Sequence, residues 1–294
     1  MAAVKPDTSL NLSALIGLFK AARVNNLLIL VLTQLCAYTF LRSEPLEASI
    51  DIELSLFVLA TIMVAAGGYI INDYFDVKID AINKPSNLVV GKTLPPRLAM
   101  IFHWILSGGS VVIAFFLDLK LGVLFIAISG LLWLYSSSLK RAFLIGNFAI
   151  ALLMGLSVFA VYLFDAGLNF NWVVFYSVFA FYTGLIREIL KDVEDMEGDR
   201  SFGCKTLPIV KGYPYTRKVL LGLTGFLGVL FIGSSIMFYQ HDFRLLAFYF
   251  IVLCGLTIHY MVNLNHADTK KEYKYLSRYL KVIMLAGILS MILK

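Results

Sequence analysis

The sequence has few charged residues, few prolines and few cysteines for its length. Only 15% of the 294 residues are charged, and 60% are hydrophobic. A soluble domain carries about 25% charged residues. The composition therefore excludes a soluble globular protein and predicts an all-α, polytopic membrane protein. The three cysteines, Cys36, Cys204 and Cys254, are too few and too dispersed for a disulfide framework, and we expect them to be unpaired.

Zinc motifs and a nucleic-acid-binding module are also missing. The four histidines are scattered, at His103, His241, His259 and His266. They show no HExxH or paired spacing, so we expect structural roles for them rather than zinc ligation. The net charge of +6 is not gathered in a soluble basic domain. Membrane lipids and an anionic substrate are therefore the expected partners, and nucleic acid is not.

Long apolar runs dominate what is present. A helix needs about 20 apolar residues to cross a bilayer, and hydropathy predicts nine such spans. They are 27–41, 54–71, 98–117, 121–135, 146–164, 172–190, 219–239, 245–262 and 279–293. Residues 1–26 are predicted to form a short interfacial segment with a helix over 10–22. Residues 1–13 lack the order of a cleavable signal, so the first span is expected to remain. The chain, 1–294, is thus predicted to be one transmembrane domain.

The distribution of basic residues predicts the orientation of these spans. With a cytoplasmic N-terminus, the outer segments contain only Arg42, Lys120, Arg244 and Lys294, so the other 21 of the 25 Lys and Arg residues lie on the inner side. Short cytoplasmic loops collect Lys and Arg. The sequence therefore predicts a multi-pass cell-membrane protein whose functional site lies at the cytoplasmic face, onto which the acidic segments open.

Two acidic clusters follow apolar runs. Each puts three oxygen-bearing side chains on one helix face, at Asn72, Asp76 and Asp80 in the first and at Asp192, Asp195 and Asp199 in the second. Like charges at this spacing repel unless a cation lies between them. Oxygen ligands suit Mg²⁺, which shares its coordination with phosphate oxygens. The clusters therefore predict a Mg²⁺ site for a diphosphate ligand, although solvated helix ends are an ordinary alternative.

A repeat links the two clusters. The letters KTLP occur at 92–95 and again at 205–208, which is 113 residues later. Asp76 and Asp80 recur as Asp195 and Asp199 at a spacing of 119. A chance repeat at matching places after matching acid pairs is improbable, so we predict two four-helix pseudo-repeats plus a closing helix, which bring the two carboxylate faces together.

Basic and aromatic residues near the clusters extend the predicted chemistry. Cations on the inner side suited to a diphosphate leaving group are Lys92, Lys140, Arg141, Lys191, Arg200 and Lys205. Aromatic faces suited to an allylic cation are Tyr74, Phe75, Trp133, Tyr135, Phe181 and Tyr182. Interfacial enrichment of Trp and Tyr, and a local Arg187 to Glu188 ion pair, are the structural alternatives. A cation-coupled transporter is the alternative function, but transport predicts acids near mid-membrane.

The motifs resemble those of a known family. Asn72, Asp73, Asp76 and Asp80 match NDxxDxxxD, and 195–199 matches DxxxD, the two signatures of the UbiA superfamily of intramembrane prenyltransferases. The resemblance covers nearly the whole chain. Within the superfamily, 187–200 and 205–209 most resemble the digeranylgeranylglyceryl phosphate synthases. The resemblance implies Mg²⁺-dependent transfer of a geranylgeranyl or other polyprenyl group from its diphosphate to a glycerol-phosphate lipid.

The residue patterns and the resemblance together predict residue roles. The catalytic set is Asp76, Asp80, Asp195, Asp199 and Lys140. The metal ligands are Asn72, Asp76, Asp80, Asp192, Asp195 and Asp199. The substrate-binding set is Asn72, Asp73, Arg23, Asn25, Tyr135, Asn147, Arg187, Lys191, Asp192, Lys92 and Lys205. Arg23 and Lys140 are implied to contact the diphosphate, and Tyr135 and Asn147 the prenyl chain.

The chain departs from the family pattern at 83–91, where relatives often have an Arg-Pro run and this sequence reads NKPSNLVVG. The departure leaves the ionisation machinery intact. It concerns the acceptor, because members acting on quinone precursors such as 4-hydroxybenzoate, or on chlorophyllide, share the first motif. An aromatic acceptor therefore stays as the alternative to the glycerol-phosphate lipid.

Overall fold

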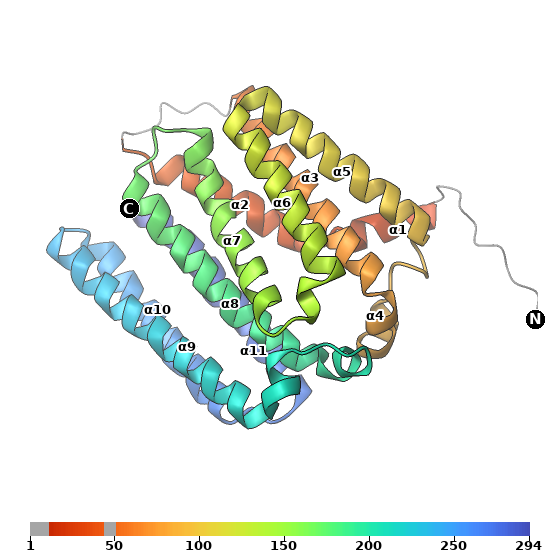
Figure 1. Cartoon of the computed structure of the whole chain (residues 1–294). Helices are drawn as coiled ribbons and strands as arrows, with labels where there is room; N and C mark the ends of the chain where they lie inside the picture. The colour runs from red at the N-terminus through yellow and green to blue at the C-terminus, as the bar shows by residue number, and fades with distance from the viewer. Residues whose placement is uncertain (1–11, 44–50) are drawn as a thin grey trace, which may run out of the picture. The chain divides into compact units, whose positions relative to one another are not determined.

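The computed structural model describes residues 12–43 and 51–294, and its regular elements are all helical (Figure 1). The chain divides into two compact units, residues 1–32 with 48–140 and residues 33–47 with 141–294. The division after Lys140 falls between the fourth and fifth predicted spans. Helix α2 (Val24–Phe40) begins in the first unit and ends in the second.

The helices confirm the predicted all-α membrane fold. In the described part of the chain, eight helices are long and apolar enough to cross a membrane, and α1 (Leu12–Ala21) with α2 makes a ninth candidate if this pair, bent by 49°, is counted as one span. Bending at a break is one way to accommodate a hydrophobic stretch that is longer than the bilayer is thick. The count of nine spans therefore includes a broken first span, which the continuous span predicted for 27–41 does not describe.

The first unit is built on the long helix α3. Its further elements are α3 (Ile52–Phe75), α4 (Val77–Asn83), η1 (Pro85–Asn87), α5 (Pro96–Leu117) and α6 (Leu119–Ser137). Two adjacent glycines let both neighbours approach α3. A Cβ atom at Gly67 would lie 2.7 Å from Ser107 Oγ of α5, and one at Gly68 would lie 2.8 Å from Leu132 Cδ1 of α6. Close backbone approach is how helices gain van der Waals contact in a bilayer.

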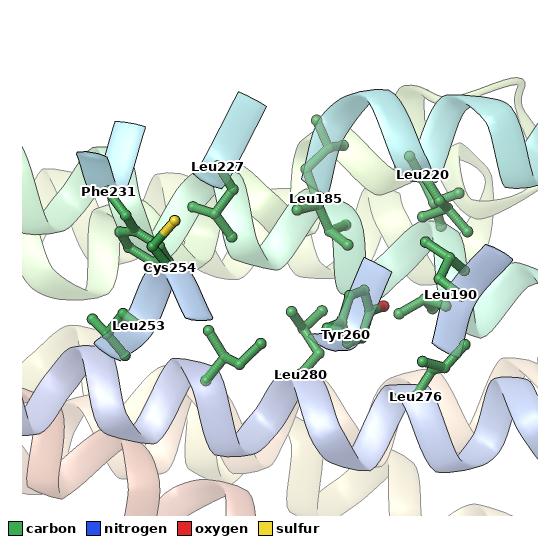
Figure 2. Packing of buried hydrophobic residues seen from close by; sticks show 14 of the residues in the cluster. Leu185, Leu190, Leu220, Leu227, Phe231, Leu253, Cys254, Tyr260, Leu276 and Leu280 are labelled. Atoms are coloured by element: carbon green, nitrogen blue, oxygen red, sulfur yellow. The ribbon is translucent and has the colours of Figure 1, made fainter. Parts of the chain in front are cut away.

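The second unit contains the larger buried core. The division between the units falls within η2 (Leu139–Arg141), and the elements of the second unit are α7 (Ile145–Phe164), α8 (Phe170–Ser201), α9 (Leu207–Gln240), α10 (Arg244–Asn265), α11 (Lys270–Leu289) and η3 (Ser290–Leu293). Leucines from α8, α9, α10 and α11 meet around Tyr260 and Phe231, as Figure 2 shows. At one end, Phe238 lies between Trp172 and Phe250, with ring centroids 5.2 and 5.0 Å away. Such ring contacts add to the burial of apolar area.

Helix α8 continues past the end of the span that hydropathy predicts. A span was predicted at 172–190, but the helix includes all residues from Phe170 to Ser201 without a break. At 1.5 Å per residue its 32 residues extend about 48 Å, against a hydrocarbon thickness of about 30 Å. The part of α8 that exceeds the hydrocarbon thickness is its acidic C-terminal end. The span predicted from hydropathy ends where the acids begin, and the helix face predicted for Asp192, Asp195 and Asp199 is present because the same helix continues through them.

Tight packing between α7 and α8 gives a test of the second unit. A Cβ at Gly155 would lie 3.0 Å from the backbone oxygen of Ser177. We expect Gly155→Leu to lower the melting temperature of the detergent-solubilised protein by several degrees, because overpacking costs about 1–3 kcal/mol or more. The matched control is Gly233→Leu, where nothing lies within 4 Å of the added Cβ. Equal melting temperatures for the two variants would contradict the packing described here.

Candidate functional site

The first acidic cluster lies where α3 ends and α4 begins. Asp76 ends α3, with φ −91° and ψ 1°, so the continuous helix predicted here is wrong at this residue. The i to i+4 hydrogen bonds nevertheless persist through the break, since Asp76 N donates to Asn72 O at 2.9 Å and Asp80 N donates to Asp76 O at 2.7 Å. The structure therefore keeps Asn72, Asp76 and Asp80 on successive turns, as predicted.

Asp76 is a buried carboxylate with two donors. Asn72 Nδ2 donates to its Oδ2 at 2.9 Å, and Lys140 Nζ forms an ion pair with the same oxygen. Asp76 is only 4% exposed. A buried charge is costly unless it is paired. The structure thus brings together two residues of the predicted catalytic set that are 64 positions apart in the sequence.

Arg23 and Asp73 form a second pair in the same unit. Arg23 NH2 donates to Asp73 Oδ1 at 2.7 Å, and the guanidinium lies 5.1 Å from the centroid of the Tyr69 ring. Arg23 has φ 53° and lies at the bend between α1 and α2, whereas Asn25 is exposed on the first turn of α2. Left-handed backbone disfavours arginine, and such strain is tolerated where contacts fix the residue. Asp73 therefore positions Arg23.

Asp80 lies on α4, outside the candidate spans. Burial raises its pKa to about 6; the charges of Asp76 and Asp73 act in the same direction, and those of Lys84 and Lys140 oppose them. Loss of solvation disfavours the ionised form of a carboxyl group. Ionised Asp80 is therefore a carboxylate that a nearby cation would stabilise.

The second acidic cluster lies on the extended end of α8. Asn147, which is buried on α7, donates from Nδ2 to Asp192 Oδ2 at 2.8 Å. Asp199 is 1% exposed, and its backbone oxygen accepts from the N–H of Cys204 at 3.0 Å, which closes the helix end. Asp195 lies one turn before Asp199 on the same helix. The carboxylate of Asp192 is thus held by a residue of α7, and the backbone of Asp199 closes the end of α8.

Glu188 holds two cations of the second unit, although it was not among the predicted site residues. It is 4% exposed, and its Oε1 accepts from Arg187 NH1 at 3.1 Å and from Lys191 Nζ at 2.9 Å. The local ion pair of Arg187 and Glu188, which was the structural alternative to a site role, is present. One buried carboxylate therefore fixes two cations of the predicted substrate-binding set. The signal in the sequence was a carboxylate one turn before Asp192, at the end of an apolar run and between Arg187 and Lys191.

The two KTLP segments agree in burial and in leading into a helix, although Leu94 and Pro95 precede α5 whereas Leu207 and Pro208 belong to α9. Lys92 and Lys205 are exposed, whereas Leu94 and Leu207 are buried. Each segment leads into a helix with proline in its first turn, at Pro96 of α5 and Pro208 of α9. Proline is suited to this position because a backbone N–H in the first turn has no partner inside the helix, so its absence costs no hydrogen bond. The repeat therefore starts the next helix in each unit, and it leaves its lysine accessible.

Aromatic side chains adjoin the first cluster. The ring of Phe75, at the end of α3, lies 5.6 Å from that of Trp133 on α6, and Trp133 in turn lies 5.4 Å from His103 on α5. Tyr135 follows on α6 and is half-buried. His103 Nδ1 lies 3.0 Å from Gly67 O, so the expected structural role of this histidine is supported. An aromatic wall thus continues from the acidic cluster along the apolar part of the first unit.

The donor set fits Mg²⁺ by its chemistry. The predicted ligands are carboxylate and amide oxygens, which hard divalent cations prefer. In the described residues, no group of three or more His, Cys, Asp or Glu side chains is gathered closely enough to hold a metal ion. The ammonium of Lys140 lies against Asp76, where a cation would otherwise balance its charge. The six-residue ligand set therefore stays a prediction.

Two digeranylgeranylglyceryl phosphate synthases are among the relatives similar in sequence. The protein from Methanosphaera stadtmanae is 30% identical over 240 residues, which cover 81% of this chain and 86% of that protein. The one from Methanobrevibacter smithii is 31% identical over 252 residues, with coverage of 83% and 88%.

Two solved structures have a similar fold. A digeranylgeranylglyceryl phosphate synthase superposes with a TM-score of 0.68 at 28% identity and covers 96% of this chain and 98% of its own. A UbiA homologue from Archaeoglobus fulgidus, bound to GPP and Mg²⁺, also gives a TM-score of 0.68, at 16% identity, with coverage of 94% and 99%. These similarities confirm the predicted fold class.

A sequence model of the UbiA prenyltransferase family matches residues 30–282, which include both acidic clusters and both KTLP segments. The match confirms the resemblance of the motifs, and it favours an enzyme over the cation-coupled transporter. The chain therefore belongs to the UbiA prenyltransferase family, whose members are membrane enzymes that transfer prenyl groups.

Proposed function

We propose that this enzyme transfers a geranylgeranyl group from its diphosphate to geranylgeranylglyceryl phosphate, in the synthesis of an ether lipid. The observation that carries the proposal is the similarity to digeranylgeranylglyceryl phosphate synthases, at 30% and 31% identity over more than four-fifths of the chain. The paired cations of Arg187 and Lys191 support it, because a glycerol-phosphate acceptor needs positive charge for its phosphate.

Mg²⁺ is the proposed cofactor, and the UbiA homologue from Archaeoglobus fulgidus was solved with it. Oxygen ligands would come from Asn72, Asp76 and Asp80 in the first unit and from Asp192, Asp195 and Asp199 in the second. When bound, the ion would neutralise negative charge on the diphosphate.

The residues of the first unit suit the departure of the diphosphate. Lys140 carries a positive charge next to a buried carboxylate, and Asp73 holds the guanidinium of Arg23 in a fixed position. Preorganised cations stabilise charge that develops on a leaving group. Breaking the carbon–oxygen bond to the diphosphate leaves an allylic cation, which the faces of Phe75 and Trp133 would stabilise. The exposed Lys92 is a further candidate for the diphosphate.

The residues of the second unit suit the acceptor. Glu188 orients both Arg187 and Lys191, so the phosphate of the acceptor would meet two cations held in place rather than mobile surface lysines. The acceptor hydroxyl oxygen then bonds to the allylic carbon, and the hydroxyl proton is released. Asn147 fixes Asp192 within the same unit, and the exposed Lys205 is a further candidate contact. We propose that acceptor binding and prenyl transfer occur at the cytoplasmic face.

The first test concerns the acidic residues. Asp76→Asn should lower kcat by about 100-fold or more, because it removes a charge from the proposed metal ligands while keeping the shape of the side chain. Prenyl transfer is measured at saturating Mg²⁺, and folding is followed by the melting temperature. Glu53→Gln, at the opposite end of α3 and exposed, is the matched control. Activity of Asp76→Asn within a few-fold of wild type would remove Asp76 from the catalytic set.

The second test concerns the acceptor. Geranylgeranylglyceryl phosphate, 4-hydroxybenzoate and dihydroxynaphthoate compete for one geranylgeranyl diphosphate donor, and we expect the phosphate lipid to be prenylated preferentially. Lys191→Gln should raise the KM for this acceptor by about tenfold, since a charge-assisted hydrogen bond is lost. The KM for the donor should be unchanged, and Lys120→Gln is the control. Preferential prenylation of either aromatic compound would refute the ether-lipid assignment and leave prenyl transfer standing.

The third test concerns the orientation. In a background without Cys36, Cys204 and Cys254, cysteine replaces Asp242 in one variant and Lys270 in another. An impermeant maleimide added to intact cells should label position 242 only, because the positive-inside distribution puts position 270 in the cytoplasm. Labelling of position 270, with protection of position 242, would reverse the proposed orientation.

A further inference from the structure

The second unit carries a concentration of cations that the proposed reaction does not use. Its members are exposed side chains in the N-terminal parts of α9, which has a kink at Gly212, and of α11. We call them the basic surface: Lys211, Lys218, Lys270, Lys271, Lys274 and Arg278. On α11, Lys270, Lys274 and Arg278 follow at intervals of four residues. They therefore lie on one helix face.

Contacts between α9 and the turn before α11 hold the two sets of cations at one end of the unit. Arg217 NH1 on α9 donates to Asp268 Oδ1 at 2.9 Å and to the backbone oxygens of Asn265 and Ala267 at 3.2 and 3.3 Å. The rings of Tyr213 and Tyr273 lie 6.1 Å apart. The basic surface is thus a fixed feature of the fold rather than a set of unrelated loop residues.

The acids within these segments do not offset the basic surface. Segments 205–218 and 266–281 contain nine Lys and Arg residues but only two acids, Asp268 and Glu272. Asp268 pairs with Arg217. Glu272 closes the capping box of α11, where it accepts from Thr269 N at 2.8 Å and from Asp268 N at 2.9 Å. Both acids have structural partners, so the side chains of the basic surface provide a large excess of positive charge.

The position of the basic surface on its helices indicates the partner. Helix α11 continues from the lysines into a candidate membrane span, so its first turns lie at the level of lipid headgroups. Exposed tyrosines accompany them, with Tyr215 at 50% and Tyr275 at 55% exposure. Lys211 Nζ lies 6.0 Å from the centroid of the Tyr215 ring. Tyrosine is enriched where one end of a side chain is in lipid and the other in water.

We propose that the basic surface binds the phosphate headgroups of anionic phospholipids. The proposal goes beyond prenyl transfer, since none of these residues belongs to the catalytic, metal-binding or substrate-binding sets. Positively charged inner loops also orient a membrane protein without binding lipid. In that ordinary case any inner lysine pair would be equivalent, whereas a binding surface makes these positions special.

The test measures lipid binding to the full chain in detergent by native mass spectrometry, with phosphatidylglycerol and phosphatidylcholine titrated separately. Wild type should bind phosphatidylglycerol more tightly. K274Q/R278Q should weaken that binding by about tenfold or more, because each interfacial charge contributes about fivefold. Its binding of phosphatidylcholine should be unchanged. K270Q/K271Q serves as a second variant if the first does not fold.

The matched control is K20Q/R97Q, which removes two exposed basic residues from the first unit. Wild-type affinity for phosphatidylglycerol in this control supports the proposal. Equal loss in control and test variants, or equal binding of the two lipids by wild type, would overturn it. Competition by millimolar glycerol 3-phosphate would also overturn it in favour of a soluble phosphate. Prenyl transfer is assayed in parallel, so failure of the proposed reaction is distinguished from failure of lipid binding.

Discussion

Pairing of buried carboxylates is the constraint on which the functional part of this protein depends. An ionised acid next to a membrane span loses hydration, and it is stable only with a partner. The first unit pairs Asp76 with Lys140, and the second surrounds Glu188 with Arg187 and Lys191. In both units the partner is a cation that the proposed reaction needs. Stability of the acid and position of the cation are therefore obtained from the same contact.

The repeat extends this relation to the backbone. Each unit has a long apolar helix that ends in acids, followed by a KTLP segment that starts the next helix. The units differ in how the acids are carried. In the first unit the helix breaks at Asp76 and resumes as α4, while in the second it runs on to Ser201. The same order of sequence features thus produces an acidic segment that is divided between two helices in the first unit and lies on one continuous helix in the second.

The sequence was sufficient for the spans, the acidic clusters and the repeat, because each is a local pattern of hydropathy or spacing. It was not sufficient for the contacts between them. Nothing in the order of residues around Lys140 shows that it pairs with Asp76, and nothing near Arg23 shows that Asp73 fixes it, since these contacts depend on how helices pack. The break at Asp76 was missed for another reason: its i to i+4 hydrogen bonds are those of a continuous helix.

Because α8 is long and unbroken, a small change in its tilt produces a large displacement at its end. From Phe170 to Asp199 the helix measures about 44 Å, so a tilt of about 10° around its first residue displaces Asp199 sideways by roughly 8 Å. Helices respond to a thicker or thinner bilayer by changing tilt. Because α8 is unbroken, a change in tilt caused by a thicker or thinner bilayer moves the carboxylates at its end. The acids of the first unit are instead divided between α3 and α4, so no single long helix carries them.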